Sequence, residues 1–140
     1  MLEIDWAVVV VHLATMGLAY LLAIPIAWNR EVEERSAGLR TFPIVSVSAC
    51  AISLLGIDVL QDADASARVI QGIIAGIGFI GGGSILKSAE GVTGTATAAS
   101  ILAVGAIGIA VAWHRMEIAI GISILTFATL TLVGRWKPGT

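Results

Sequence analysis

Residues that could do chemistry are scarce inside the apolar runs of this 140-residue sequence. His12, Tyr20 and Cys50 are the ionisable side chains well within those runs. Charge deep in a membrane segment normally marks a transport site, and that signal is almost missing here. A lone histidine near the end of a run is more often a hydrogen-bonded packing residue. We predict packing for His12, with proton handling as the alternative.

Acidic residues gather in one connecting segment, at Asp58, Asp62 and Asp64. Carboxylate oxygens with retained water suit a hard cation such as Mg²⁺. Loop acids more often only solvate a turn, so we predict no metal site and keep metal binding as the alternative. No catalytic residue and no cofactor are predicted, because nucleophile–base pairs, His/Cys metal spacing and phosphate loops are missing outside the apolar runs.

The segment Gly76–Gly81 matches the dinucleotide fingerprint GxGxxG. That motif needs a preceding strand, a helix that begins at the glycines and an acid about 20 residues later. Here the glycines lie inside an apolar run, and the next acid, Glu90, is too close. The sequence therefore argues against nucleotide binding.

The same glycines suit close contact between membrane helices. Gly72 and Gly76 form a small-xxx-small pair, and Gly78 with Gly82 extends the pattern on a neighbouring face. Lipid tails give helices little hydrophobic reason to associate, so backbone contact at small residues supplies much of the attraction. The run Gly81-Gly-Gly83-Ser84 weakens a helix by about 1 kcal/mol per glycine. We predict tight packing there, with a broken segment lining a polar cavity as the alternative.

Composition identifies the elements that must position these residues. Hydrophobic residues make up 57% and charged residues 13% of the chain, against about 45–50% and about 25% in an ordinary soluble domain. Too little polar surface remains for a globule in water, and disorder needs the opposite balance. A single cysteine excludes a disulfide scaffold. The net charge of −2, without a basic face, predicts no nucleic-acid partner.

The fold class that remains is an all-α integral membrane protein. A helix that crosses a bilayer needs about 20 mostly apolar residues, with a range of about 17–25. Continuous apolar runs argue against the alternation of a membrane β-barrel. The predicted spans cover residues 6–28, 41–57, 69–86, 95–113 and 118–133. These five spans leave no room for a soluble domain.

Charge also predicts the orientation. No Lys or Arg precedes Trp6, which argues against a signal peptide and favours a retained helix with its N-terminus outside. The inner side then receives Arg30, Arg35, Arg40, Lys87, Arg135 and Lys137, and the outer side receives Arg68 and Arg115. By the positive-inside rule, this bias places the C-terminus in the cytoplasm.

Two connections carry further candidates. Mixed charges in Asn29–Arg40 predict ion pairs along a short interfacial helix that ends at Gly38, after which Arg40 and Thr41 open the second span. The fourth span begins with small and hydroxyl residues that can bond across helices. The short Lys87–Gly91 connection predicts that the third and fourth spans pack as an antiparallel hairpin.

Three segments together carry a family resemblance. They are AGLRTFPIVSVSA (Ala37–Ala49), GIIAGIGFIGGGSIL (Gly72–Leu86) and GTATAASILAVGAIGIA (Gly94–Ala110), in this order. They resemble the membrane domain of the MgtC/SapB family, and the likeness runs from the first span to the fifth. Members are similar in having five spans, an Arg-rich inner loop and often a C-terminal cytoplasmic domain. Because the sequence ends at Thr140, we expect that domain to be absent.

The resemblance also implies candidate positions. The family's Glu-Arg-Glu at the end of the first span reads Asn29-Arg30-Glu31 here, and its aspartate and arginine before the third span match Asp64 and Arg68. The Thr-Thr and the tryptophan usual in the fourth span are replaced by Ala96-Thr97 and Ile101-Leu102. The functional candidates are Asn29, Arg30, Glu31, Gly38, Arg40, Thr41, Asp64, Arg68, Gly72, Gly76, Gly78, Gly81, Gly83, Gly94, Thr95 and Thr97.

The resemblance implies a bacterial inner-membrane protein linked to growth at low magnesium and to virulence, which modulates other membrane proteins, including ATP synthase. Our leading hypothesis is a non-enzymatic regulator that binds partner membrane proteins in the lipid bilayer through glycine-rich helix faces. The rival is a small cation (Mg²⁺) transporter or channel, whose pore would require oligomers because five helices offer no even-numbered inverted repeat. We expect a homo-oligomer, most simply a dimer.

Overall fold

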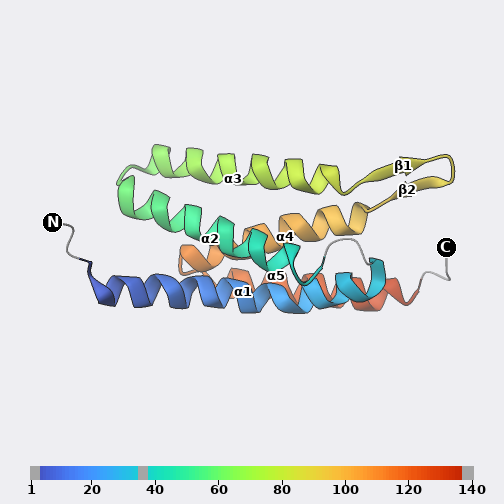
Figure 1. Ribbon diagram of the computed structural model, residues 1–140, viewed down its shortest axis with the longest axis horizontal. Helices are drawn as coiled ribbons and strands as arrows, with labels where there is room; N and C mark the ends of the chain where they lie inside the picture. Colours follow the sequence, from blue (N-terminus) through green and yellow to red (C-terminus); the bar gives the residue numbers. More distant parts are fainter. Residues whose placement is uncertain (1–3, 35–37, 137–140) are drawn as a thin grey trace.

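The computed structural model describes residues 4–34 and 38–136, which form five long helices and one small hairpin (Figure 1). The elements are α1 (Trp6–Glu34), α2 (Thr41–Val59), α3 (Ala63–Gly83), β1 (Leu86–Ser88), β2 (Gly91–Thr93), α4 (Thr95–Ala112) and α5 (Met116–Gly134). All five helices are long and apolar enough to cross a membrane. The predicted all-α fold with five spans is confirmed.

The first helix is longer than its predicted span. It has 29 residues, or about 44 Å at 1.5 Å per residue, whereas the hydrocarbon core of a bilayer is about 30 Å thick. The prediction of a separate interfacial helix is wrong for residues 29–34, which continue α1 because Glu and Arg are good helix formers. Glu3, Arg35 and Lys137 lie outside the described residues.

The third helix begins earlier and ends sooner than predicted. The Asp62 carboxylate accepts the Ala65 N–H at 3.1 Å, and this cap starts α3 at Ala63. Asp64 and Arg68 therefore lie on the helix and not in the preceding loop. At the other end α3 continues unbroken through Gly83. The glycine run is thus the end of a helix, and the alternative of a break inside a span is wrong.

A two-stranded hairpin replaces the predicted loop between α3 and α4. Leu86 pairs with Thr93 and Lys87 with Val92 in antiparallel register. The hairpin projects past the helix ends, and α3 and α4 run antiparallel on either side of it (Figure 1). The predicted antiparallel packing of these two helices is confirmed, because α3 contacts α4 along the bundle.

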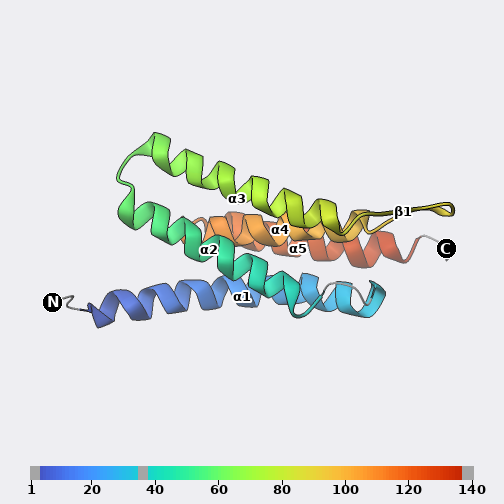
Figure 2. The same ribbon diagram turned by 45° about the horizontal axis from the view of Figure 1, so that its top comes forward.

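The fourth helix is the centre of the bundle. It contacts each of the other four helices, and 56% of its most apolar window is buried, against 11% for α5. Ile101, Val104 and Ile107 of α4 are almost fully buried together with Phe42 and Ile26. In both views α3 lies at the periphery, so much of its surface faces outward (Figures 1 and 2).

The two ends of the bundle carry different groups. One end holds the start of α1, the α2–α3 loop and the α4–α5 turn, and we call it the His12 end (Figure 1). The opposite end holds the end of α1, the start of α2 and the hairpin, and we call it the Arg30 end (Figure 1). The start of α1 and the end of α5 lie at opposite ends of the bundle, as an odd number of spans requires.

Candidate functional site

At the Arg30 end, the last turns of α1 bury two polar side chains. Asn29 is 9% exposed and Arg30 is 5% exposed. The Asn29 Oδ1 atom accepts hydrogen bonds from Arg30 Nε at 3.3 Å and from Arg30 Nη2 at 3.1 Å. A guanidinium so far from water needs such acceptors, because an unsatisfied buried charge is very costly. These two candidates therefore act together as one buried polar unit.

Glu31 and Gly38 meet where the chain returns toward α2. The Glu31 Oε2 atom accepts the Leu39 N–H at 3.1 Å. A Cβ on Gly38 would lie 2.7 Å from Glu31 Cβ and 2.8 Å from Glu31 Cα, so the position is too close to α1 for a side chain. Arg40 follows, exposed, and Thr41 begins α2 half-buried. Six of the family-motif candidates thus lie at the Arg30 end, where α1 ends and α2 begins.

Two further candidate glycines join α3 to α4. Gly94 has a φ of +85°, and a Cβ there would lie 2.9 Å from the carbonyl carbon of Ser84. A Cβ on Gly81 would lie 3.2 Å from the Ala98 carbonyl oxygen. Gly94 needs glycine because its φ is left-handed and backbone meets backbone there, whereas Gly81 marks a close approach of α3 to α4. Thr95 is exposed beside this junction.

Thr97 lies in the first turn of α4 and is 1% exposed, so it belongs to the core.

The remaining candidate glycines lie on the open surface of α3. Within the described chain, nothing lies within 4 Å of a Cβ built on Gly72, Gly76, Gly78 or Gly83. These glycines are therefore not used in contacts between helices of the described chain, and the predicted contact with a partner protein stays a prediction. Internal helix contacts use Gly81 instead, together with Gly105 and Gly108 of α4, which sequence reasoning did not select.

Gly72 and Gly76 line an open groove between α2 and α3. The groove has a volume of about 470 Å³, and its walls are apolar side chains such as Ile44 and Ile52 of α2 and Ile80 of α3. Ile44 is 63% exposed and Ile52 is 47% exposed. This surface faces outward in the bundle, and the glycines let another helix approach its backbone closely. We call this surface, including its two glycines, the α2–α3 groove.

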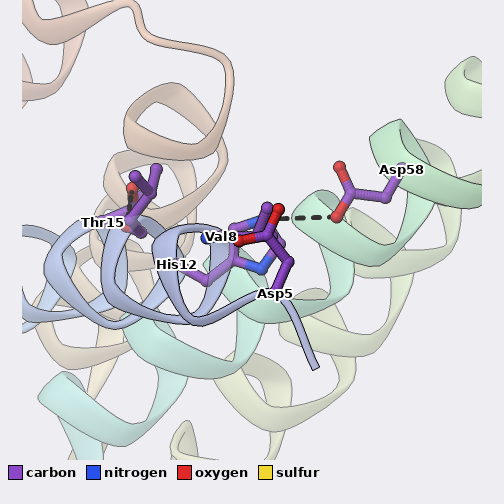
Figure 3. Close-up of polar contacts among 6 residues, drawn as sticks. Asp5, Val8, His12, Thr15 and Asp58 are labelled. Carbon is purple, nitrogen blue, oxygen red and sulfur yellow. Dashed lines mark hydrogen bonds and ion pairs between the residues drawn. The ribbon is translucent and has the colours of Figure 1, made fainter. Parts of the chain in front are cut away.

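The His12 end holds a histidine–aspartate contact that links two helices. His12 of α1 and Asp58 of α2 face each other, with His12 Nε2 3.2 Å from Asp58 Oδ2 (Figure 3). The side chains are 30% and 49% exposed, so solvent weakens the attraction. Packing was predicted for His12, and its partner was missed because the two residues are 46 positions apart. The only available signal was that both lie at the same predicted end of neighbouring spans.

A hollow of about 370 Å³ with mixed polar and apolar walls adjoins this pair, and Asp62 and His114 also line it. Asp62 is engaged as the α3 cap. Among the described residues, no group of three or more His, Cys, Asp or Glu side chains is arranged to hold a metal ion. The hollow is a water-accessible recess beside the α1–α2 contact.

Asp64 and Arg68 lie on α3 at the His12 end, far from the motif residues at the Arg30 end (Figure 1). Both side chains are exposed. The structure therefore separates the candidates into a polar cluster at one end, the outward glycines of α3, and a charged pair at the other end.

Comparison with known proteins identifies the family of this chain. The sequence model described as the MgtC family matches residues 16–137. The chain belongs to the MgtC family. The predicted resemblance is confirmed, and with five spanning helices the chain is a multi-pass membrane protein.

Relatives within the family are similar over most of this chain. Protein SrpB of Synechococcus elongatus is 32% identical over 133 residues, which cover 86% of this chain and 71% of SrpB. Protein SapB of Bacillus subtilis is 31% identical over 70% of this chain and 46% of its own length. Protein MgtC of Brucella abortus is 36% identical over 69% of this chain and 40% of its own length. The chain thus spans less than half the length of the latter two relatives. No solved structure matches it.

Proposed function

We propose that this MgtC-family chain is a non-enzymatic accessory protein of the bacterial inner membrane, which binds other membrane proteins through the α2–α3 groove. Its physiological setting is magnesium homeostasis or virulence-type stress adaptation, with ATP synthase among the candidate partners. The Arg30 end faces the cytoplasm, because Arg30, Arg40, Lys87 and Arg135 lie at that end.

The outward glycines of α3 carry this proposal. Gly72, Gly76 and Gly78 lie inside a helix, yet nothing in the described chain comes within 4 Å of a Cβ at any of them. Each glycine weakens a helix by about 1 kcal/mol relative to alanine, so the three together cost about 3 kcal/mol. Within the fold these glycines make no close helix contact that would offset this cost. Close contact with another protein would offset it.

The packed interior favours this function over the rival transporter. Between the two polar ends, Ile26, Val104 and Ile107 are fully buried at the centre of the bundle. The interior also holds buried hydroxyls such as Ser46 and Ser100, but a close-packed interior holds no continuous water path. Transport by a single copy would therefore need a large rearrangement, whereas binding at the α2–α3 groove needs none.

The test is crosslinking in native membranes with Gly76→Leu, compared with Gly17→Leu. Gly17 is a matched control, because it is an exposed glycine on α1 with nothing within 4 Å of its Cβ position. We expect Gly76→Leu to abolish crosslinks to other membrane proteins and Gly17→Leu to keep them. Equal crosslinking by both variants would refute the proposal. Mg²⁺ flux into proteoliposomes that depends on Asp64 would instead favour the transporter.

A further inference from the structure

One amide side chain lies near the middle of a spanning helix, far from both membrane surfaces. Gln71 is the ninth residue of α3, which begins at Ala63 and ends at Gly83. At 1.5 Å per residue, Gln71 is about 12 Å along the axis from the start of the helix. The whole helix is about 30 Å long, which matches the thickness of the hydrocarbon core. Gln71 is therefore close to the centre of the membrane.

The same amide lies on the side of α3 that faces away from the bundle. The packed side of α3 is marked by buried residues such as Ile73 and Ile77. Successive residues of a helix turn by about 100°, so Gln71 is about 200° away from Ile73 around the axis. Gln71 is exposed, and in Figure 2 the outer side of α3 carries no other element. Lipid is the surrounding that the fold alone gives to this side chain.

Within the described chain, the Gln71 amide makes no hydrogen bond. The other two amide side chains of the sequence, Asn29 and Gln61, are in different surroundings. Asn29 accepts two hydrogen bonds from Arg30, and Gln61 lies in the loop between α2 and α3, at the end of the bundle where water reaches it. Gln71 is the amide for which neither the fold nor water supplies a partner.

Hydroxyl groups in the spans do not have this problem, because they bond to their own helix. Ser100 donates to the Ala96 carbonyl oxygen at 2.7 Å, and Thr129 donates to the Leu125 carbonyl oxygen at 2.7 Å. An amide without a partner in hydrocarbon carries a large free-energy cost. Long Lys and Arg side chains can reach the surface from inside a membrane, but the shorter Gln71 cannot do so from mid-depth. A polar group of a neighbouring helix would remove the cost.

Gln71 belongs to a row of polar and small residues along the outer side of α3. Steps of four and three alternate along this row, and that spacing keeps it on one face of the helix, as in the seam of a coiled coil. In contrast, the outer side of α5 exposes large apolar residues such as Ile124 and Leu125, which suit lipid. The members are all exposed, and we call them the Gln71 row: Asp64, Arg68, Gln71, Ala75, Gly78 and Gly82.

The row allows a second helix to come close enough to bond with Gln71. Within the described chain, nothing lies within 4 Å of a Cβ built on Gly78 or Gly82. Small residues let the backbones of two membrane helices approach closely. An amide both donates and accepts, so an asparagine or glutamine opposite Gln71 would satisfy both of its groups at once. A serine or threonine there would instead tend to bond to its own helix.

A second copy of this chain offers an amide at the right depth but the wrong charges. All copies have one orientation in the membrane, so a two-fold pair sets each Asp64 level with Asp64 of the partner subunit. Each Arg68 is likewise level with Arg68 of the partner subunit. Like charges that face each other disfavour an interface. A helix of another protein can meet Gln71 without this repulsion.

We propose that the Gln71 row binds a membrane-spanning helix of another protein, one that carries an asparagine or glutamine at mid-depth, with which Gln71 exchanges hydrogen bonds. This inference rests on the proposed function, because it takes binding to other membrane proteins as given. It adds a contact surface beside the α2–α3 groove, since Gly72 of the groove directly follows Gln71, and it names the chemistry of the helix that fits there.

The experiment is a double-mutant cycle with a synthetic probe helix in phosphatidylcholine vesicles. The probe is a polyleucine helix with lysines at both ends, one glutamine at its centre and a dansyl group, kept dilute in the lipid; a matched probe has leucine at the centre. Energy transfer from the tryptophans of the chain reports binding. A central amide lies at mid-depth whichever way the probe is inserted. We expect wild type to bind the glutamine probe about 3- to 30-fold more tightly than the leucine probe.

Three variants assign that preference to one side chain. Gln71→Leu should bind both probes equally, and because Gln71 is exposed and makes no hydrogen bond in the described chain, the variant should still fold. Gln71→Asn keeps the amide and should keep the preference. The matched control is Tyr20→Phe, which removes a hydroxyl from a side chain of α1 that is 45% exposed, and it should behave as wild type. A wild type without preference, or a Gln71→Leu that retains it, would overturn the inference.

A second copy is tested as the rival occupant in the absence of the probe. Two differently tagged copies are co-expressed, solubilised in mild detergent and co-purified. We expect the amount recovered to be the same for wild type and Gln71→Leu. Pairing of wild-type copies that is lost in Gln71→Leu would show that the row binds a second copy, and the inference would be wrong.

The inference and the proposed function can fail separately. If Gly76→Leu abolishes crosslinks to other membrane proteins but wild type binds both probes equally, the inference is wrong and the proposed function stands. If the probes show the preference at Gln71 but native crosslinks do not depend on Gly76, the α2–α3 groove is not the binding surface, and the Gln71 row remains one.

Discussion

The closest approach between helices predicts the effect of one added methyl group. Gly108 of α4 is buried where α4 crosses α2. A Cβ on Gly108 would lie 3.0 Å from Cys50 N and 3.0 Å from the carbonyl carbon of Ser46, and closer still to the Ser46 carbonyl oxygen. These are backbone atoms that cannot rotate away. Gly108→Ala must therefore push α2 and α4 apart.

The magnitude follows from two opposing effects. Overpacking a core costs about 1–3 kcal/mol, and a backbone clash belongs at the upper end of that range. Against this, replacing glycine by alanine inside a helix stabilises the helix by about 1 kcal/mol. The net loss in the free energy of unfolding is about 2 kcal/mol, which is about 30-fold in the equilibrium constant.

Gly105→Ala is the matched comparison. There the new Cβ would meet only the side chain of Ile77, with Cγ1 at 3.2 Å and the terminal methyl closer. A flexible side chain can turn aside, so overpacking and helix propensity nearly cancel. We expect the free energy of unfolding to change by no more than about 1 kcal/mol in either direction.

Reversible unfolding in mixed micelles with increasing dodecyl sulfate measures both variants. Gly108→Ala should unfold at a clearly lower dodecyl sulfate fraction than the wild type, and Gly105→Ala close to it. If Gly108→Ala were as stable as Gly105→Ala, the contact between α2 and α4 would not be as close as the structure has it.

Two other predictions concern the ends of the bundle. Asp58→Asn should lower the free energy of unfolding by no more than about 1 kcal/mol at pH 6, since the pair with His12 is partly exposed; a double-mutant cycle with His12→Gln measures the coupling, and a coupling of zero would mean that the pair adds nothing. Gly94→Ala should cost about 1–3 kcal/mol, because a left-handed φ of +85° strains any side chain. The same micelle unfolding reports it, and a stable Gly94→Ala would contradict the backbone contact with Ser84.

Much of the fold could be predicted because each span is a local feature. Continuous apolar length gives a helix without knowledge of its neighbours, and the five helices all lie where the sequence places them. The positions at which the helices begin and end were harder to predict, since they depend on particular side chains. Asp62 starts α3 six residues before the predicted span, and the helix formers after Trp28 carry α1 through Glu34.

The use of the glycines could not be predicted in the same way. A small-xxx-small pair says that one face of a helix allows close approach, but not which neighbour uses it. Gly105 and Gly108 contact α3 and α2 only because α4 lies at the centre, and that position depends on all five helices. The His12–Asp58 pair depends on the same arrangement.

The central place of α4 has a consequence for how the chain is made. Helices α1, α2 and α3 are synthesised before the one helix that contacts all of them. Translation runs at about 5–20 residues per second, so the roughly thirty residues from the end of α3 to the end of α4 take about 1–6 seconds. During that interval α1 can contact α2 and α2 can contact α3, but the surfaces that all three present to α4 have no partner yet. The core of the bundle therefore closes when α4 packs between them, and α5 then packs against α4 and α1.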